Sequence, residues 1–200
     1  MFYHLEGKIE EIRENLVVLD CRGLGFALNA TLNTISKLKL GEVTKLYIAE
    51  AIGENNFDLY GFADKSEKRC FEMLLSVSGV GPKAAISILS HSTPDSLALA
   101  IMNDDAKALT VAPGIGKKIA QRVILELKDK ISKEFASIDV SAIQAPIASS
   151  GGNPNVSDAL TALGVLGYTG ADVSPVLKKL DTAGMTTEEI IKAVLKHMVN

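Results

Sequence analysis

The chain has 200 residues, of which 47 % are hydrophobic and 22 % charged, and its net charge is −3 at pH 7. This composition is typical of a folded protein of one to three domains and excludes an intrinsically disordered chain. No apolar run approaches the ~20 residues that a membrane span needs. No basic-then-apolar signal opens the chain, so we expect a cytoplasmic protein without a membrane segment.

The charge is unevenly distributed along the chain. Residues 1–63 carry 6 Lys/Arg against 9 Asp/Glu, residues 64–135 carry 11 against 9, and residues 136–200 carry 4 against 6. Only the middle segment is basic, which is the sign expected of a nucleic-acid-binding region. The overall negative charge therefore does not exclude a nucleic-acid partner.

Residues 1–63 have the pattern of short β-strands. We expect strands within 2–9, 15–19, 23–28, 46–49 and 57–62, a charged connection at 10–14, and one short helix at 32–38. The last two strands flank the turn-forming tetrad Gly53-Glu54-Asn55-Asn56, which predicts a hairpin. Such a set of short strands favours a small closed barrel, with an OB-fold as the leading candidate.

Residues 64–135 change to helical periodicity and contain an internal repeat. Thr93-Pro94-Asp95 has the composition of a helix start. The segment 74–89 aligns with 109–124 at an offset of 35 residues, so that Leu74, Gly79, Gly81, Lys83 and Ala85 recur as Leu109, Gly114, Gly116, Lys118 and Ala120. Each copy is an apolar helix end, a Gly-x-Gly turn and a new helix, which predicts an all-α tandem helix-hairpin-helix domain.

The turns Gly79-Val80-Gly81 and Gly114-Ile115-Gly116 are suited to phosphate binding. Glycine permits positive φ and leaves the backbone uncovered, so that successive N–H groups can face an anion at a helix N-terminus. Lys83 and the pair Lys117-Lys118 add charge there, whereas Val80 and Ile115 should pack inward. Since no base-reading residue is evident, we predict binding to the DNA backbone without sequence specificity.

Three other interpretations of these turns are weaker. Gly79 to Ala84 matches a dinucleotide-binding fingerprint, but helical rather than strand spacing precedes it. The second turn lacks the spacing and the Ser/Thr of a phosphate-binding P-loop. A pair of plain structural turns is the third interpretation, against which the repetition and the adjacent lysines argue.

Residues 136–153 are small, polar and glycine-rich, which is typical of a flexible linker. Beyond them we expect a three-helix, UBA-like module over 154–200. Ser157 is predicted to cap its first helix and Gly167 to end it, with further helices over 173–180 and 187–198. A module of about 45 residues is too small to be very stable alone.

The order of these parts resembles the RuvA family of Holliday-junction-binding subunits of the bacterial branch-migration machinery. The motifs that carry the resemblance are Leu59-Tyr60-Gly61-Phe62, Ser78-Gly79-Val80-Gly81-Pro82-Lys83, Pro113-Gly114-Ile115-Gly116-Lys117-Lys118 and Leu166-Gly167-Tyr168. The resemblance covers the whole chain and implies an α+β multidomain fold. It also implies a homotetramer, or an octamer on the junction, with the AAA+ ATPase RuvB and the resolvase RuvC as partners.

The resemblance also assigns site residues. Implied DNA contacts are Ser78, Gly79, Val80, Gly81, Pro82, Lys83, Gly114, Ile115, Gly116, Lys117, Lys118 and Arg122. Implied motor contacts are Leu163, Leu166, Tyr168 and Leu195, which would suit a module core equally well. In the family the barrel hairpin carries a pair of acidic residues, the acidic pin, which repels phosphates. Here Glu54 keeps one acidic position and Asn55 replaces the other, so we expect weaker repulsion, assisted by Asp58.

No catalytic constellation is evident in the sequence. It shows no Ser/His/Asp set, metal cluster or nucleotide-binding loop, so we expect a non-enzymatic scaffold without cofactor or metal. Cys21 and Cys70 have no Cys or His at metal-ligand spacing and are expected to be free thiols. Two alternatives stay open: a lyase or nuclease on a helix-hairpin-helix scaffold, for which Asp104-Asp105 looks instead like a helix start, and a protein-only adaptor acting through the C-terminal module.

Overall fold

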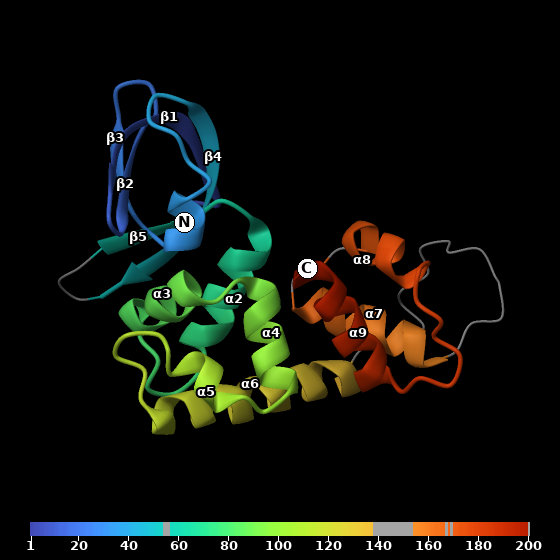
Figure 1. Cartoon of the computed structure of the whole chain (residues 1–200). Helices are drawn as coiled ribbons and strands as arrows, with labels where there is room; N and C mark the ends of the chain where they lie inside the picture. The colour runs from blue at the N-terminus through green and yellow to red at the C-terminus, as the bar shows by residue number, and fades with distance from the viewer. Residues whose placement is uncertain (54–56, 138–153, 167, 169, 200) are drawn as a thin grey trace.

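The computed structural model describes residues 1–53, 57–137, 154–166, 168 and 170–199. In chain order it builds a β-barrel, a central group of helices and a C-terminal group of helices (Figure 1). Glu54, Asn55 and Gly167, and the predicted linker from residue 138 onward, lie outside the described residues.

The barrel is closed by strands in the order β1-β2-β3-β5-β4. The strands are β1 (His4–Arg13), β2 (Leu16–Asp20), β3 (Gly25–Ala30), β4 (Val43–Ile52) and β5 (Phe57–Phe62), and the short helix α1 (Leu32–Ile35) follows β3. Neighbouring strands are antiparallel except β3 and β5, which pair in parallel. Inward-facing side chains fill the barrel: Ile9, Val17, Leu19, Leu28, Ala30, Leu46, Ile48 and Leu59.

The prediction that residues 10–14 separate two strands was wrong. β1 continues through this charged stretch to Arg13, and β2 begins at Leu16. The register of the β1–β2 pair shifts between Ile9 and Glu11, as in a β-bulge. A bulge bends a strand around a barrel, and here it lets charged side chains such as exposed Glu10 occupy a strand without entering the core.

The central helices are α2 (Lys65–Leu75), α3 (Pro82–His91), α4 (Pro94–Met102), α5 (Ala106–Leu109) and α6 (Lys117–Ser137). Two predicted helix starts are confirmed. The hydroxyl of Thr93 accepts the Ser96 N–H at the start of α4, and the carboxylate of Asp105 accepts the N–H groups of Lys107 and Ala108 at the start of α5. Since α6 reaches Ser137, the first two residues of the predicted linker are helical instead.

The C-terminal helices are α7 (Pro154–Val165), α8 (Gly170–Leu177) and α9 (Thr187–Val199). The predicted start of α9 is confirmed, and Thr186 and Glu189 form a capping box there, since Glu189 accepts the Thr186 N–H at 2.8 Å. The predicted cap at Ser157 was wrong, because α7 begins three residues earlier with Pro154, a residue suited to the first helical turn. The middle helix also begins and ends three residues before the predicted bounds 173–180.

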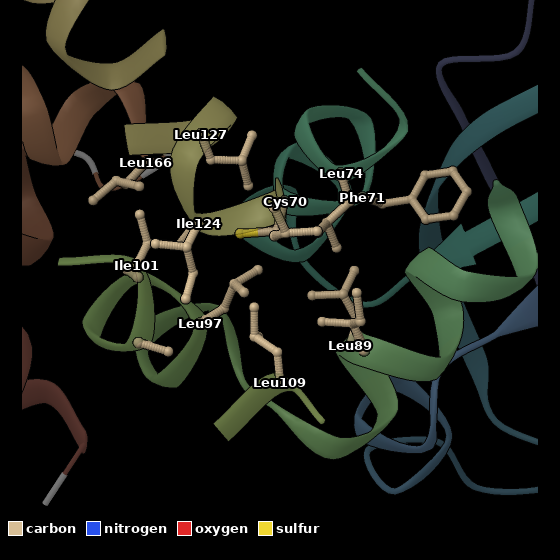
Figure 2. Close-up of a cluster of buried hydrophobic side chains, with 14 of the residues drawn as sticks. Cys70, Phe71, Leu74, Leu89, Leu97, Ile101, Leu109, Ile124, Leu127 and Leu166 are labelled. Atoms are coloured by element: carbon tan, nitrogen blue, oxygen red, sulfur yellow. The ribbon is translucent and has the colours of Figure 1, made fainter. Parts of the chain in front are cut away.

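All these helices contribute to one continuous hydrophobic core (Figure 2). Leu166, which follows α7, lies in the same cluster as Ile101 of α4 and Ile124 of α6. Helix α9 packs against both α4 and α7, and α7 packs against α6. The C-terminal helices are therefore docked on the central helices rather than forming a core of their own.

A buried carboxylate joins the barrel to the helices. Glu67 of α2 is 1 % exposed and accepts hydrogen bonds from the hydroxyls of Thr31 and Thr34 at α1, the latter at 2.6 Å. The Thr34 hydroxyl in turn accepts the N–H of Ala63, just after β5, at 2.9 Å. Burial raises the pKa of Glu67 above its usual range, although both hydroxyls act in the opposite direction. This contact fixes the barrel against the helices that carry the glycine turns.

The raised pKa of Glu67 predicts a pH-dependent stability. The contribution of a carboxyl whose folded-state pKa is raised is fully present below its unfolded value of 4.5 and is lost as the pH rises through the folded value. The Glu67→Gln variant cannot ionise at this position. The free energy of unfolding of the unmodified protein should therefore fall relative to that of Glu67→Gln as the pH is raised from 4.5 toward neutrality. Urea unfolding followed by circular dichroism at several pH values measures this difference.

The control is Glu72→Gln, an exposed carboxyl on the same helix. This variant removes a surface carboxylate that lies 3.5 Å from the ammonium group of Lys68, so it shows the effect of losing a charge on α2 without the buried contact. A constant difference between Glu67→Gln and the unmodified protein across the range would contradict the prediction.

Candidate nucleic-acid interface

The two glycine turns have the same backbone geometry. Gly79 and Gly114 adopt positive φ values of +85° and +82°. Equivalent hydrogen bonds hold both copies: Val80 N–H to Val77 O and Ile115 N–H to Ala112 O at 3.1 Å, and Ala85 N–H to Gly81 O and Ala120 N–H to Gly116 O at 3.0 Å. The repeat in the sequence is thus a repeat in structure, in which α2 and α3 flank the first turn and α5 and α6 the second.

The middle residue of each turn packs inward, as predicted. Val80 and Ile115 are each 5 % exposed and belong to the core that the helices share. These buried side chains anchor each turn to the protein, so the backbone on the opposite side of the turn faces solvent.

The second glycine of each turn leaves open space above the backbone. A Cβ built on Gly81 or Gly116 would meet no protein atom within 4 Å, and neither residue has a positive φ. The fold itself therefore does not require glycine at these positions. A side chain there would, however, stand between the backbone and any approaching ligand.

The N-terminus of α3 presents unpaired donors to this space. Gly81 is its N-cap and offers no side-chain cap, while Pro82 occupies the first turn. The first N–H groups of a helix have no partner within the helix, and the helix dipole makes them attractive to an anion. A phosphate oxygen is suited to this arrangement.

Lys83, Lys117 and Lys118 lie beside the turns and are exposed. Among the described residues, no carboxylate lies within ion-pair distance of any of the three, whereas Lys128 on the same helix α6 pairs with Asp104 at 2.7 Å. The lysines at the turns therefore keep their charge available for a ligand. Each turn thus combines exposed backbone with at least one exposed lysine, as an anion site requires.

Arg122 lies at the first turn, although it follows the second in sequence. Its guanidinium donates from Nη1 to the carbonyl oxygen of Ser78 at 3.2 Å, and its Nε is 3.9 Å from a carboxylate oxygen of Glu126. Glu126 also accepts the N–H of Ser78 at 3.2 Å. Sequence reasoning missed Glu126, and the only signal for it was its position one helical turn after Arg122.

A groove of about 580 Å³ lies between the barrel and α3, beside the residue that precedes the second turn. Its walls include Glu14, Asn29 and Asp58 from the barrel, Lys83 and His91 from α3, and Pro113 from the second turn. Asp58 pairs with Ala51 in the β4–β5 ladder, one step from its last pair, Ile52 and Phe57. The acidic residue that we expected to assist the acidic pin thus lines the same groove as a lysine of the anion site.

The residues predicted to contact a motor are largely buried. Leu163, Leu166 and Leu195 are 0–2 % exposed and lie in the shared core. Tyr168 is half-buried, and its hydroxyl donates to the carboxylate of Asp95 in the first turn of α4. Burial, together with this hydrogen bond, raises the pKa of Tyr168, so it remains a protonated donor.

Cys70 and Cys21 are free thiols, as predicted. Burial raises the pKa of Cys70 to about 12, so it is an unreactive core residue. Within the described parts of the chain, no group of three or more His, Cys, Asp or Glu side chains is placed to hold a metal ion. No helix there combines the length and apolar character needed to cross a membrane.

Comparisons with known proteins match all three parts of the chain. The family model for the RuvA N terminal domain matches residues 1–61, that for a SAM-like helix-hairpin-helix tandem matches 71–129, and that for the RuvA C-terminal domain matches 154–199. Over 199 residues the chain is 40 % identical to the Holliday junction branch migration complex subunit RuvA of Ruminiclostridium cellulolyticum, covering 99 % of this chain and 100 % of the relative.

Proteins of the same name in other organisms match at similar levels. The protein of Acetivibrio thermocellus is 40 % identical over 199 residues, covering 99 % of this chain and 98 % of the relative. The protein of Christiangramia forsetii is 38 % identical over 200 residues, covering 99 % and 100 % respectively. These matches agree with the predicted α+β multidomain fold of barrel, tandem helix-hairpin-helix domain and C-terminal helices.

The open space above Gly116 predicts that a small side chain at this position weakens DNA binding but has little effect on the stability of the fold. In Gly116→Ala the methyl group meets no protein atom but blocks an anion from the backbone, so DNA binding should weaken about tenfold or more. The melting temperature should fall by only a few degrees, because the poorer N-cap that alanine makes costs about 1 kcal/mol. A fluorescence-anisotropy titration with labelled DNA and a thermal melt test both statements.

The matched control is Gly164→Ala in α7, where the added methyl also meets nothing within 4 Å. It should leave DNA binding unchanged. Wild-type affinity in Gly116→Ala would show that the second turn does not contact DNA.

Proposed function

This chain belongs to the RuvA family, and we propose that it binds four-way (Holliday) junction DNA as a non-catalytic subunit of a branch migration complex. The observation that carries the proposal is the pair of equivalent turns with open backbone at Gly81 and Gly116. A two-point backbone site suits a DNA duplex arm, whose phosphates repeat regularly.

Recognition in this proposal follows the phosphate backbone and not the bases. Backbone N–H groups and lysine ammonium groups bind phosphate oxygens, which carry no sequence information. The contacts come from the residues of both turns, Ser78 to Lys83 and Gly114 to Lys118, and from Arg122. A branch point that moves through arbitrary sequence requires a subunit of this kind.

We assign a separate role to each part of the chain. Residues 64–135 hold the duplex arms, and residues 1–63 of four subunits meet at the crossover in a homotetramer, or in an octamer of two tetramers. Glu54 then brings a negative charge to the crossover, where Asn55 brings none and Asp58 adds a second carboxylate nearby. Carboxylates repel the negatively charged phosphates over about a Debye length, so this acidic pin would keep the junction centre open.

Residues 138–153 connect α6 to the C-terminal part, and residues 154–200 recruit the AAA+ ATPase RuvB, which drives branch migration. Of the four implied motor contacts, Tyr168 alone keeps appreciable exposed surface, because Leu163, Leu166 and Leu195 are buried. The motor contact therefore begins at the surface around Tyr168, and the leucines support the module. The resolvase RuvC is the third partner of the same junction.

The proposal predicts a preference for branched DNA. In a gel-shift titration the full chain should bind a four-way junction at least several-fold more tightly than a linear duplex of the same sequence. Affinity should fall by orders of magnitude between about 50 and 200 mM salt, since counterions compete for phosphates. Equal affinity for the two DNA forms would overturn the proposal.

The same assay separates the alternatives. Strand cleavage of the junction in magnesium, without any partner, would favour a nuclease. Junction binding that is unaffected by the double substitution Lys117→Gln and Lys118→Gln would remove these lysines from the interface. No detectable junction binding by the full chain would favour a protein-only adaptor.

The acidic pin has a separate test. Glu54→Gln should bind the junction as tightly as the unmodified protein or more tightly, because it removes repulsion of phosphate. Strand separation at the crossover, measured by 2-aminopurine fluorescence at the branch point, should decrease. The control is Glu6→Gln, an exposed carboxyl near the other end of the barrel sequence. Unchanged fluorescence in Glu54→Gln would refute the pin.

A further inference from the structure

Each phosphate-binding turn is held by a helix of the other motif. In α3, the hydroxyl of Ser87 donates to the carbonyl oxygen of Pro113, just before the second turn, at 2.8 Å. In α6, Arg122 donates to the carbonyl oxygen of Ser78, just before the first turn, at 3.2 Å. The two hydrogen bonds therefore cross between the motifs, and we call this pair the crossed contacts.

The crossed contacts obey the repeat in the sequence. Residues 87 and 122 are separated by 35 positions, and so are residues 78 and 113, which is the offset that aligns the two motifs. Both donors thus occupy one position of the repeat, and both acceptors occupy another. A pair of unrelated surface hydrogen bonds would not show this correspondence.

A departure from this symmetry at Ser78 and Pro113 has a chemical reason. Ser78 has an N–H group, which donates to the carboxylate of Glu126 at 3.2 Å. Pro113, its counterpart, has no N–H and needs no acceptor. The counterpart of Glu126 is His91, whose Nδ1 instead lies 2.9 Å from the carbonyl oxygen of Ser87.

Helix α6 makes a third contact with the same region. The ammonium group of Lys130 donates to the carbonyl oxygen of Ser76 at 3.0 Å and to its hydroxyl at 2.5 Å. Arg122, Glu126 and Lys130 are spaced four residues apart and so lie along one face of the helix. This face holds the chain from the end of α2 to the first turn.

The anchored carbonyls control where the turns point. The carbonyl of Ser78 shares a planar peptide unit with the N–H of Gly79, and the two groups point in opposite directions. A hydrogen bond that fixes the direction of this carbonyl therefore also fixes the opposite direction of the Gly79 N–H. The Ser87 hydroxyl does the same for Gly114 through Pro113.

We propose that Ser87, Arg122 and Glu126 are positioning residues that join the two turns into one rigid site of fixed spacing and orientation. Each motif aims the amides of the other, so the turns engage two phosphates of one duplex arm together. This proposal deepens the function proposed above and rests on it. Pre-aligned donors bind more tightly because less ordering is required on association.

Ser87 gives the cleanest test, because it is uncharged and, unlike Arg122, cannot itself neutralise a phosphate. Ser87→Ala should weaken binding to both junction and linear duplex about five- to tenfold, as expected when one turn is misaligned. The slope of log affinity against log salt should fall in magnitude by about one, because the misaligned turn no longer brings the ammonium group of Lys117 or Lys118 to its phosphate. Ser87→Thr keeps the hydroxyl and should restore both affinity and slope.

The matched control is Ser90→Ala, one turn along α3. The Ser90 hydroxyl accepts the N–H of Leu32 of α1 at 3.1 Å, so this variant loses a similar hydrogen bond, but one that involves no turn. Its salt slope should equal that of the unmodified protein. The proposal is overturned if Ser87→Ala keeps the wild-type slope, or if Ser90→Ala lowers the slope equally.

A measurement without DNA separates this proposal from the proposed function. Amide hydrogen exchange at Ile115, whose N–H donates to the carbonyl oxygen of Ala112 at 3.1 Å within the second turn, should become faster in Ser87→Ala and stay unchanged in Ser90→Ala, as followed by NMR of the full chain. Unchanged exchange in Ser87→Ala would refute the positioning role even if the junction is bound. A protein that shows no junction preference but accelerated exchange in Ser87→Ala would refute only the proposed function.

Discussion

The structure depends on one constraint: backbone N–H groups at the two turns must have no partner within the protein and must still be held in a fixed direction. Nearly all buried backbone donors in proteins find partners, so unpaired ones require an open surface and a rigid support. Positive φ at Gly79 and Gly114 reverses the chain, and the buried side chains of Val80 and Ile115 hold the turns down. The crossed contacts then fix the direction of each peptide unit.

The charged side chains near the turns also fall into two classes: those that are available to a ligand and those that have a partner within the protein. The lysines beside the turns have no acidic partner among the described residues, so their charge stays available, whereas Glu126 is engaged by Arg122 and the Ser78 N–H. The acidic excess of the chain lies largely in the barrel, across the groove that Lys83 and Asp58 share. A net charge of −3 is therefore compatible with a local anion site, because charges more than a Debye length apart are screened from one another.

The turns could be predicted because their signal is local. A Gly-x-Gly turn with inward Val80 or Ile115 lies within a few residues, and its repetition excludes chance. The contact between Arg122 and Ser78 spans 44 positions and depends on how two motifs pack, which no local pattern encodes. The sequence predicts too short a first strand, because the charges of residues 10–14 are typical of a loop. Alternate positions of a barrel strand face solvent, however, so β1 can carry these charges.

Helix α6 shows why the parts of the chain are not independent. Its N-terminus completes the second turn, one of its faces holds the first, and Ile124 and Leu127 enter the core that Leu166 also joins. A C-terminal segment of about 45 residues buries too little surface to be stable alone, which explains why its apolar residues extend into the central core. In the sequence, a helical module with its own core and one that packs on a neighbouring domain show the same spacing of leucines. Only the packing in the structure distinguishes the two. The C-terminal helices, which we propose recruit a motor, therefore share a core with the helix that follows one glycine turn and holds the other.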